Sequence, residues 1–537
     1  MGIKLKKNKI DMEKLLTKTD FILYRDCSHN VWMKWHRPEE YSKFEISEFE
    51  KSLGVMGNEV ELEARKLFPE GVLIDGRNIK YQERTRELVD KHQSVIFQAV
   101  FATEKYLAAA DILKWNDEAK AYDLYEVKMS SVDEDTESEN NKPKKVDPKQ
   151  EEQFEYDLAF QVNVMKMCGV NINKKYLLRI NKGYVREGEL NLEKLFEATD
   201  KTEIVGGEWE GVVLGEMETA YNFLSKEVEP KGPCGCYYKG RKRHCTSFGL
   251  INPQVPDYSV HDLHRIGNSK KLLAELLEEG LVSMDDLSEY DDRFAPKKPK
   301  TGEEPSKPKK LNQIKAHKSQ APIVDIEAIR GELDSLVFPL YFLDYETFPT
   351  AIPPFDGYHP YQHIVFQYSL HILRSKDGEL EHKECLVLDG DPAEHIVSSM
   401  REHIGDTGSV ISWYKHFENS RNRELAHMLP HHAGFLHSVI NRTYDLMDIV
   451  DNQHYVHHGF KGIASIKKVQ QVLAPNFSYK ELDVQNGTDA IEAYRQIYTG
   501  ELVGDEAEDK KKQMLLYCKN DTEVMVIIWK FFADLVK

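Results

Sequence analysis

Carboxylates in the first half of the chain have the spacing of metal ligands. Asp111 ends an apolar strand-like run, and Glu126 and Lys128 stand two residues apart in another. Side chains alternate along a strand, so Glu126 and Lys128 share one face while Val127 packs on the other. If the two runs form a hairpin, Asp111 and Glu126 can bind one divalent cation, and Lys128 can orient a water molecule or stabilise a phosphate charge. The alternative is an amphipathic hairpin with solvated charges.

A second group of carboxylates lies in the other half. Asp344 and Glu346 are two residues apart in FLDYETF, so they share one face of a strand. Tyr517 and Asp521 are four residues apart in a helix-like segment, so they also share one face. Between these pairs, Glu418 stands where the strand-like VISWY gives way to helical sequence. Short acidic pairs are common in proteins. A metal site is therefore indicated by the order of all three segments and not by any one of them.

Three of the seven cysteines, Cys234, Cys236 and Cys245, fall within twelve residues. Seven cysteines in 537 residues do not make a disulfide framework, whereas clustered thiolates bind zinc or iron–sulfur, with chance and packing as the alternative. The loop between them, YYKGRKRH, either contacts a phosphate backbone or is a solvated tip. Its basic residues are Lys239, Arg241, Lys242 and Arg243.

Segments typical of strands and helices alternate in both halves and would position these residues. An initial helix after a Thr cap is followed by strands at 94–103, 105–115, 122–130 and 175–180 and by a helix at 154–170. The second half has strands at 337–348, 365–373 and 410–414 and a last helix at 513–536. Strands followed by helices in both halves predict two α/β domains.

Composition suggests where the domains begin and end. At roughly 150 residues per domain, the length corresponds to two to four domains, and 41% apolar residues are enough for folded cores. Residues 130–152 are predicted to be a solvated insertion, because they carry no aromatic side chain. The predicted segments are a domain at 1–250, a small helical segment at 251–295, a disordered Lys/Pro linker at 296–322 and a domain at 323–537.

Charge and hydropathy exclude several classes of protein. The net charge of −18 excludes a uniformly basic nucleic-acid coat, although it leaves room for a local basic groove. Because no stretch approaches 18 apolar residues, we expect no membrane span. The first residues lack the apolar segment of a signal peptide, so we expect a cytoplasmic protein.

The motifs of the first half resemble the RecB-like PD-(D/E)XK nucleases, and most closely the iron–sulfur branch that includes the CRISPR-associated exonucleases and AddB. The resemblance implies a restriction-endonuclease-like fold. In it, Asp111 and Glu126 bind Mg²⁺ or Mn²⁺, Lys128 is catalytic, and Gln161 belongs to the helical motif. A 4Fe-4S cluster, with Zn²⁺ as the alternative, would be held by Cys27, Cys234, Cys236 and Cys245.

The sequence departs from that family at two places, and at a third it offers two candidates. Met165 stands four residues after Gln161, where the family usually has Tyr. The upstream helix normally supplies a His or Glu ligand, and here it offers Glu61, with Glu59 as the competitor. The cysteine spacing C-x-C-x8-C differs from the usual C-x2-C followed by a short gap, which leaves the type of cluster open.

The second group of carboxylates resembles the DEDD exonucleases of the ribonuclease H-like fold. The resemblance implies two bound metal ions and a tyrosine that orients the attacking water. The implied ligands are Asp344, Glu346, Glu418 and Asp521, and the implied tyrosine is Tyr517. The family's middle carboxylate is usually Asp, so Asp445, followed by Asp448, is the alternative to Glu418. The tracts 352–371 and 459–469 also resemble a bacterial family of unknown function, in which a RecB-like nuclease is often fused to this domain.

The sequence therefore predicts a metal-dependent exonuclease, a hydrolase with two candidate active sites that acts on DNA in repair or in the degradation of foreign DNA, including antiviral defence. Because no G-x-x-x-x-G-K-[ST] motif is present, either a partner helicase would supply any unwinding or the protein would act on ends that are already single-stranded. One alternative is a single working site that acts on RNA. Another is a non-catalytic nucleic-acid-binding scaffold with decayed nuclease folds.

Overall fold

The structure is a computed structural model that describes all residues except 1–13, 44–47, 133–147, 296–306, 478–483 and 485. The chain divides into two compact units. Unit 1 comprises Met1–Tyr237, Cys245–Asn252 and Ala351–Tyr361, and unit 2 comprises Tyr238–His244, Pro253–Thr350 and Gln362–Lys537. Each unit combines a sheet with helices, so the predicted α/β class is confirmed.

The sheet of unit 1 has seven strands within the described residues. They are β1 (Leu16–Thr17), β2 (Val72–Leu73), β3 (Val95–Ala102), β4 (Tyr106–Asn116), β5 (Ala121–Val132), β6 (Ile172–Asn181) and β7 (Phe196–Asp200). The order is β2-β3-β4-β5-β6-β7, and β1 runs parallel to β4. β3, β4 and β5 form an antiparallel meander, and β6 is parallel to β5. The four strands predicted in this half are confirmed.

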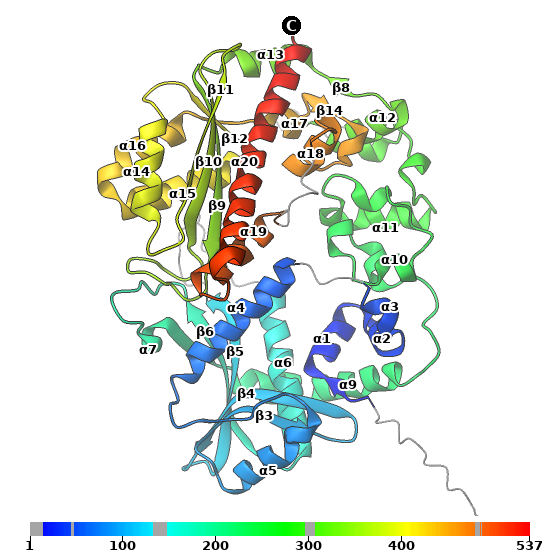
Figure 1. Cartoon of the computed structure of the whole chain (residues 1–537). Coiled ribbons are helices and arrows are strands. Elements are labelled where there is room, and N and C mark those ends of the chain that lie inside the picture. Colours follow the sequence, from blue (N-terminus) through cyan, green and yellow to red (C-terminus); the bar gives the residue numbers. More distant parts are fainter. Residues whose placement is uncertain (1–13, 44–47, 133–147, 296–306, 478–483, 485) are drawn as a thin grey trace, which may run out of the picture. The chain divides into compact units, whose positions relative to one another are not determined.

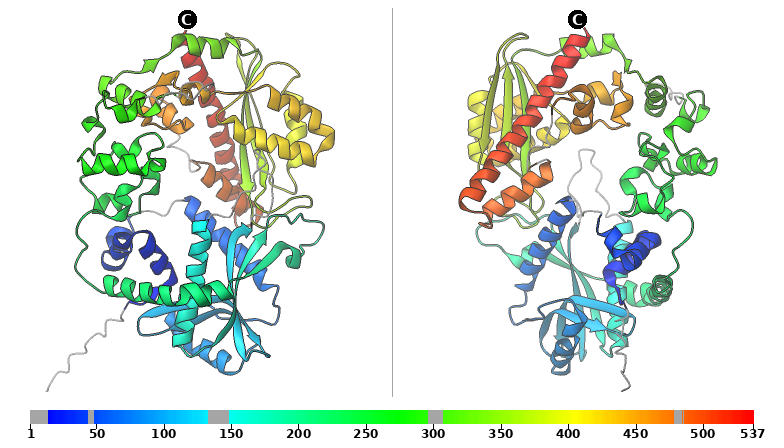
Figure 2. Two further views of the ribbon diagram at one scale, coloured as in Figure 1. Left: turned by 180° about the vertical axis from the view of Figure 1, so that it is seen from behind. Right: turned by 45° about the vertical axis from the view of Figure 1, so that its right-hand side comes forward.

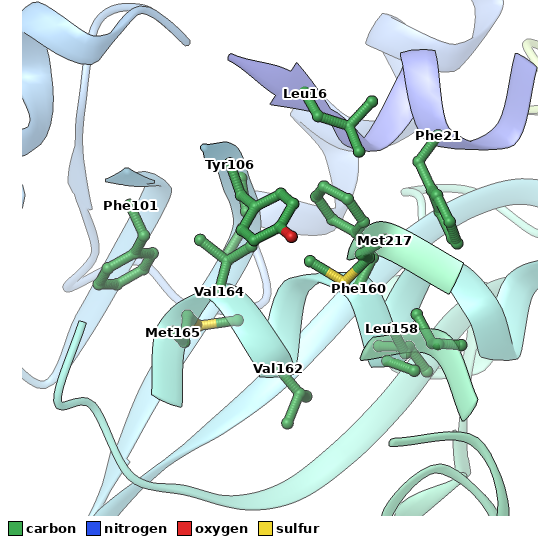
Figure 3. Packing of buried hydrophobic residues seen from close by; sticks show 14 of the residues in the cluster. Leu16, Phe21, Phe101, Tyr106, Leu158, Phe160, Val162, Val164, Met165 and Met217 are labelled. Carbon is green, nitrogen blue, oxygen red and sulfur yellow. The ribbon is translucent and has the colours of Figure 1, made fainter. Parts of the chain in front are cut away.

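Helices cover both faces of this sheet. On one face, α1 (Lys18–Asp26), α6 (Pro148–Met167) and α9 (Glu210–Leu224) build the larger core, in which Phe21 and Phe160 stack with centroids 5.3 Å apart (Figure 3). On the other face, Val60 and Ala64 of α4 (Glu48–Arg65) pack against β3, β4 and β6. The predicted Thr cap is Thr17, whose side chain accepts a hydrogen bond from the backbone N–H of Asp20.

The sheet of unit 2 has five strands among the described residues. They are β9 (Leu340–Pro349), β10 (His363–Leu373), β11 (Leu380–Leu386), β12 (Ser409–Ser412) and β13 (Thr443–Asp445). The order is β11-β10-β9-β12-β13; the first three strands are antiparallel, and β12 and β13 run parallel to β9. β9, which carries the predicted carboxylates, is thus the central strand.

Helices also cover both faces of the second sheet (Figures 1 and 2). The long helix α20 (Gly504–Leu535) crosses one face, and α14 (Ala393–His403), α15 (Lys415–Met428) and α16 (Ala433–Asn441) lie on the other. Alternation along β9 separates these faces: Leu343 packs in the core beneath α14, whereas Phe342 meets Trp529 of α20. Asp344 and Glu346, which share the parity of Phe342, therefore face α20.

The remaining α-helices of four or more residues in the described chain are α2 (Ser28–His36), α3 (Pro38–Tyr41), α5 (Gln82–Asp90), α7 (Leu192–Leu195), α10 (Phe248–Ile251), α11 (Lys270–Glu278), α12 (Lys309–Ser319), α13 (Ile326–Asp334), α17 (Asp448–Asp451), α18 (Ile466–Leu473) and α19 (Gly487–Tyr498). A short antiparallel pair joins β8 (Ile323–Val324) to β14 (Tyr455–Val456). No helix in the described parts of the chain is long and apolar enough to cross a membrane.

The predicted linker at 296–322 is wrong for its second half. Residues 309–319 form α12, and the side chains of Leu311 and Ile314 are buried. Their three-residue spacing places them on one face of a helix, while Lys309 pairs with Asp451 and Lys318 donates to the backbone carbonyl of Asp285. Residues 296–306 of that prediction, and residues 133–147 of the predicted insertion, lie outside the described residues.

One segment of the second half belongs to unit 1. Arg186 donates hydrogen bonds to the backbone carbonyls of Pro353 and Pro354 at 3.0 and 2.7 Å. The backbone N–H of Gly188 donates to Asp356 at 2.8 Å. A single boundary near residue 323 therefore does not describe the division, because the chain returns to unit 1 at 351–361. Of residues 251–295, predicted as a separate helical segment, 251–252 group with unit 1 and 253–295 with unit 2.

Candidate active sites

The structure gathers the predicted residues of the first half inside unit 1. Asp111 lies within β4 rather than at its end, and Glu126 and Lys128 lie on β5. Gln161 projects from α6, and Glu61 from α4. Among them Glu126 is 1% and Gln161 0% exposed. As predicted, Val127 packs in the core on the opposite face.

The pairing of β3 with β4 is interrupted at Asp111, although the register is the same on both sides. Phe97 pairs with Ile112 and Ala99 with Ala110, so Gln98 stands opposite Asp111. Phe97 and Ala99 pack in different cores although they are two residues apart, so the alternation of side chains is reset at Gln98. Gln98 has a φ of 56°, in the left-handed region that non-glycine residues rarely adopt. Such strain is typical of functional sites.

Gln98 connects two of the predicted carboxylates. Its amide nitrogen donates to Glu61 and, at 3.2 Å, to Asp111, while its carbonyl oxygen accepts from Arg77. Arg77 also pairs with Glu61 at 2.8 Å. The second oxygen of Asp111 accepts from the backbone N–H of Val127 at 3.0 Å. Sequence reasoning missed Gln98, although one polar residue in the apolar run VIFQAVFA was a signal.

Glu126 is surrounded by donors. Gln161 donates to it at 2.6 Å, Lys128 lies 2.9 Å away, and Lys18 at the beginning of α1 forms a further ion pair. Lys128 also pairs with Asp157 of α6. Asp157 was missed, although its place one helical turn before Gln161 puts it on the same face. For Lys18 the sequence carries no comparable signal.

Burial and neighbouring charges set the ionisation of this site. Burial raises the pKa of Asp111 to about 7, and repulsion from Glu126 adds to the shift. Burial opposes ionisation of Glu126 as well, but Lys128 and Lys18 outweigh it and hold the pKa of Glu126 below its usual range. Lys128 is also buried, yet Glu126 and Asp157 raise its pKa. Lys128 therefore stays a cation, suited to stabilising a phosphate charge rather than to accepting a proton.

The donor set of this site fits a divalent cation. Asp111 and Glu126 supply the oxygen ligands that Mg²⁺ and Mn²⁺ prefer. The buried side-chain oxygen of Gln161 has no hydrogen-bond partner among the described residues. Lys18 and Arg77 now bind carboxylate oxygens of this cluster, so a metal ion would have to replace part of their charge.

The structure also gathers the predicted residues of the second half. Asp344 and Glu346 lie on β9, Tyr517 and Asp521 one turn apart on α20, and Glu418 in the first turn of α15. Glu346, Glu418 and Asp521 are buried. Four carboxylates from three elements thus meet in unit 2, a placement that is costly unless their charge is neutralised.

The ionisation of this cluster reflects crowding of like charges. Burial raises the pKa of Asp344 well above its usual range, and repulsion from Asp521 adds to it. Burial and repulsion from Asp344 do the same to Glu346 and to Glu418. Lys467 is the cation that opposes the shifts of Asp344 and Glu346. Carboxylates in such a setting are stabilised either by protons or by a metal ion.

Tyr517 is positioned as a neutral donor. Burial raises the pKa of its hydroxyl, and the nearby charges of Asp521, Glu346 and Asp344 raise it further. The ammonium of Lys467 lies 5.0 Å from the centre of the Tyr517 ring. The hydroxyl therefore keeps its proton and can hold a water molecule by hydrogen bonding.

The candidate metal ligands include a residue that sequence reasoning missed. Ligand atoms of Asp344, Glu346 and Cys518 all lie within 4.8 Å of one another. The Cys518 sulfur is 3.8 Å from an Asp344 carboxylate oxygen. Carboxylate oxygens suit Mg²⁺ and Mn²⁺, whereas a thiolate favours softer metals such as Zn²⁺. The position of Cys518 next to Tyr517 was the available signal.

The structure separates the two candidates for the middle carboxylate. Asp445 accepts hydrogen bonds from the backbone N–H groups of Tyr414, Lys415 and Met447 at 2.8, 2.9 and 3.2 Å. These hydrogen bonds stabilise the beginning of α15, so Asp445 has a structural role. By contrast, one buried oxygen of Glu418 has no hydrogen-bond partner among the described residues. Glu418 is therefore the better candidate ligand.

Four cysteines meet in unit 1. Cys27 lies between α1 and α2, and its sulfur and those of Cys234, Cys236 and Cys245 all lie within 4.8 Å of one another. None of the four forms a disulfide within the described residues, and Cys27, Cys234 and Cys236 are buried. The side-chain amide of Asn252 contacts the Cys234 sulfur at 3.4 Å. A single tetrahedral Zn²⁺ would hold four sulfurs roughly 3.8 Å apart, so these positions suit one ion directly. A 4Fe-4S cluster needs a wider cage.

The basic loop between the cysteines is partly engaged within unit 2. Arg241 pairs with Asp262 at 2.7 Å and donates to the backbone carbonyl of Asp257 at 3.0 Å. Its guanidinium therefore holds the loop in place. The side chains of Lys242 and Arg243 are exposed, and that of Lys239 is half-exposed. Phosphate contact by this loop stays a prediction.

Comparison with known proteins places part of the chain among sequences without an assigned activity. Residues 341–465 match a family model described as a domain of unknown function (DUF2779). That segment contains Asp344, Glu346, Glu418 and Asp445 and ends before α20. The chain is also 24% identical over 214 residues to an uncharacterized protein of Mycoplasma genitalium, covering 36% of this chain and 32% of the relative. An uncharacterized protein of Ureaplasma parvum is 27% identical over 250 residues, covering 42% and 34%. The chain thus spans about a third of the length of these relatives.

Proposed function

We propose that the chain is a metal-dependent nuclease with one active site in each unit. The observation that carries the proposal is the cluster of Asp344, Glu346, Glu418 and Asp521, four carboxylates brought together with Lys467 as the neighbouring cation. Burying such a cluster has a functional explanation if divalent metal ions bind there. Two ions would flank a scissile phosphate and stabilise the attacking and leaving oxygens.

The topology of unit 2 supports this reading. A central first strand, with two strands of the antiparallel hairpin series on one side and two parallel strands on the other, is the arrangement that the ribonuclease H-like resemblance implies. In that reading the DEDD ligands are Asp344 and Glu346 of β9, Glu418 of α15 and Asp521 of α20. Tyr517, which keeps its proton, orients the attacking water.

Unit 1 supports a second site of the PD-(D/E)XK kind. Asp111 and Glu126 would bind the metal ion, with Glu61 reached through Gln98. Lys128, held as a cation between Glu126 and Asp157, would stabilise charge on the phosphate. DNA is the substrate we propose, and exonucleolytic digestion the mode of action.

The four cysteines would hold a structural centre. Their sulfur positions suit one Zn²⁺, whereas the family resemblance favours 4Fe-4S. In either case the centre connects the first helices of unit 1 to residues 234–245. Elemental analysis of protein purified without oxygen distinguishes the two, since iron with inorganic sulfide indicates a cluster and zinc at one equivalent indicates a single ion.

The deciding experiment is a nuclease assay with Mn²⁺ or Mg²⁺ on end-labelled single- and double-stranded DNA and RNA. The variants are Asp111→Asn, Asp344→Asn and the double variant, with the exposed Asp117→Asn and Asp334→Asn as controls in units 1 and 2. We expect each site variant to lose a distinct part of the activity and the controls to lose none. Activity on RNA alone, removed by one variant, would support the single-site alternative. Equal activity of wild type and double variant would overturn the proposal.

A further inference from the structure

Another group of metal-ligating side chains lies in unit 2, away from the carboxylate cluster. Glu394 occupies the first turn of α14, and His431 and His432 lie in the short 3-10 turn η9 (Pro430–His432), which joins α15 to α16. One ligand atom from each lies within 4.8 Å of the others. These helices cover the face of the sheet opposite α20, so this group is separate from Asp344 and Glu346.

The three side chains converge in the manner of ligands to one ion. The Nε2 atom of His431 is 2.9 Å from one oxygen of Glu394, and the Nε2 atom of His432 is 2.9 Å from the other. Adjacent ligands of a tetrahedral Zn²⁺ lie roughly 3.3 Å apart. Small rotations of exposed side chains would therefore admit an ion between the carboxylate and the two imidazoles.

Neighbouring residues hold His432, the most buried of the three candidate ligands, in place. His432 is 6% exposed, and Leu436, one turn later in α16, is anchored in the core. Ser398, one turn after Glu394 on α14, donates to Glu394 at 3.1 Å and lies 3.4 Å from His432 Nε2. Glu394 and His431 are exposed, so an ion can reach the site from solvent.

Ion pairing alone accounts poorly for this arrangement. A surface pair contributes about 0–1 kcal/mol, and a second histidine on the same carboxylate adds a like charge if both are protonated. The buried Nδ1 of His432 has no hydrogen-bond partner among the described residues, so a proton there would be left unsatisfied. A neutral imidazole that binds a metal through Nε2 keeps its proton on Nδ1, so the metal-bound form leaves the same N–H without a partner; what metal binding removes is the repulsion between two imidazolium groups on one carboxylate.

We propose that Glu394, His431 and His432 bind one transition-metal ion of the Zn²⁺ type, with water completing its coordination. Two imidazoles and a carboxylate select Zn²⁺, Co²⁺ or Ni²⁺ over Mg²⁺ and Ca²⁺. Bound metal links α14 to the turn between α15 and α16. Because His432 Nδ1 lacks the outer partner that usually strengthens a ligand by about 10–100-fold, we expect micromolar affinity.

The test compares full-length wild type with Glu394→Gln and His431→Gln, both exposed changes that leave the core intact. His437→Gln, another exposed histidine of the same region on α16, is the matched control. Metals bound after purification are quantified first, so that the cysteine centre is accounted for. Each protein is then titrated with Zn²⁺ by calorimetry and with Co²⁺ by visible absorption.

We expect wild type and His437→Gln to bind one more equivalent of Zn²⁺ than either site variant. We also expect a Co²⁺ ligand-field band without thiolate charge transfer, which both site variants lose. A rise in thermal midpoint with Zn²⁺ should follow the same pattern. Equal stoichiometry and affinity in wild type, Glu394→Gln and His431→Gln would overturn the proposal.

Discussion

Lys18 and Glu126 form an ion pair across 108 residues of sequence, and the Glu126 side chain is 1% exposed. The ammonium of Lys18 thus lies beside the carboxylate that the proposed mechanism assigns to a metal ion. This ammonium neutralises Glu126 in the metal-free protein, and a divalent cation would compete with it for the same carboxylate.

Replacing Lys18 by Met keeps the aliphatic stem and removes this competitor. We expect Mn²⁺ to bind unit 1 at least several-fold more tightly. We also expect the metal-free protein to lose about 1–2 kcal/mol of stability, less than for a fully orphaned charge because Lys128 remains 2.9 Å from Glu126. Calorimetry in an Asp344→Asn background, which disables the site of unit 2, measures the affinity.

The control for that change is Lys34→Met, which removes an ion pair with Asp20 of 2.7 Å elsewhere in unit 1. It should leave Mn²⁺ affinity unchanged. Weaker Mn²⁺ binding by Lys18→Met than by wild type would show that Lys18 supports the metal site rather than competing for it.

The raised pKa of Asp111 predicts a pH dependence of stability in metal-free protein. Its pKa rises from 3.8 to about 7 on folding, so the native state holds a proton that the unfolded state has released. This contribution is fully present below pH 3.8 and is lost as the pH rises through about 7. With EDTA present, the thermal midpoint of wild type should therefore fall more between pH 4.5 and 7.5 than that of Asp111→Asn. Saturating Mn²⁺ should abolish this difference between the two proteins. If the thermal midpoints of wild type and Asp111→Asn fell equally with pH in EDTA, the prediction would be wrong.

The two candidates for the middle carboxylate predict opposite outcomes. Glu418→Gln should reduce the activity of unit 2 at least about 100-fold, since a metal ligand is lost. It should leave stability unchanged or raised, because a buried carboxylate in an acidic cluster is removed. Asp445→Asn should cost about 1–2 kcal/mol of stability through the weakened start of α15 and retain most activity per folded molecule. Chemical denaturation measures the stability of both variants, and the nuclease assay measures their activity. If Asp445→Asn lost activity and Glu418→Gln lost stability, Asp445 would be the metal ligand and Glu418 the structural residue.

Loss of one cysteine should empty the cysteine centre. Cys234→Ser is expected to reduce bound zinc or iron to a small fraction and to lower the thermal midpoint by several degrees. Cys168→Ser, a half-buried cysteine of unit 1 outside the cluster, is the matched control and should keep full metal content. Elemental analysis measures the bound metal, and calorimetry measures the thermal midpoint. Equal metal content in both variants would show that the four cysteines do not bind the metal.

Much of the fold near the candidate sites could be predicted because the signals are local. The runs that became β3, β4, β5 and β9 are apolar and rich in residues that favour strands. The two-residue spacing predicted that Glu126 and Lys128 share one face of a strand, and the four-residue spacing predicted that Tyr517 and Asp521 share one face of a helix. The start of α20 at Gly504, before the predicted 513, lies in charged sequence without apolar periodicity.

What could not be predicted depends on distant contacts. Neither Lys18 nor Arg77 lies near its carboxylate partner in sequence, and both positions look like ordinary solvated charges. The return of residues 351–361 to unit 1 is fixed by Arg186, about 170 residues earlier. The lysine-rich composition of α12 concealed the short apolar face formed by Leu311 and Ile314.

The proposed cysteine centre would also constrain the order in which the protein can mature. Cys27 leaves the ribosome long before Cys245, and at roughly 5–20 residues per second the intervening chain takes ten seconds or more to synthesise. During that interval Cys27 is a thiol without its partners. If the four cysteines bind a metal as proposed, the centre can therefore form only after the sheet and α9 have been translated, and metal supply would act late in the assembly of unit 1.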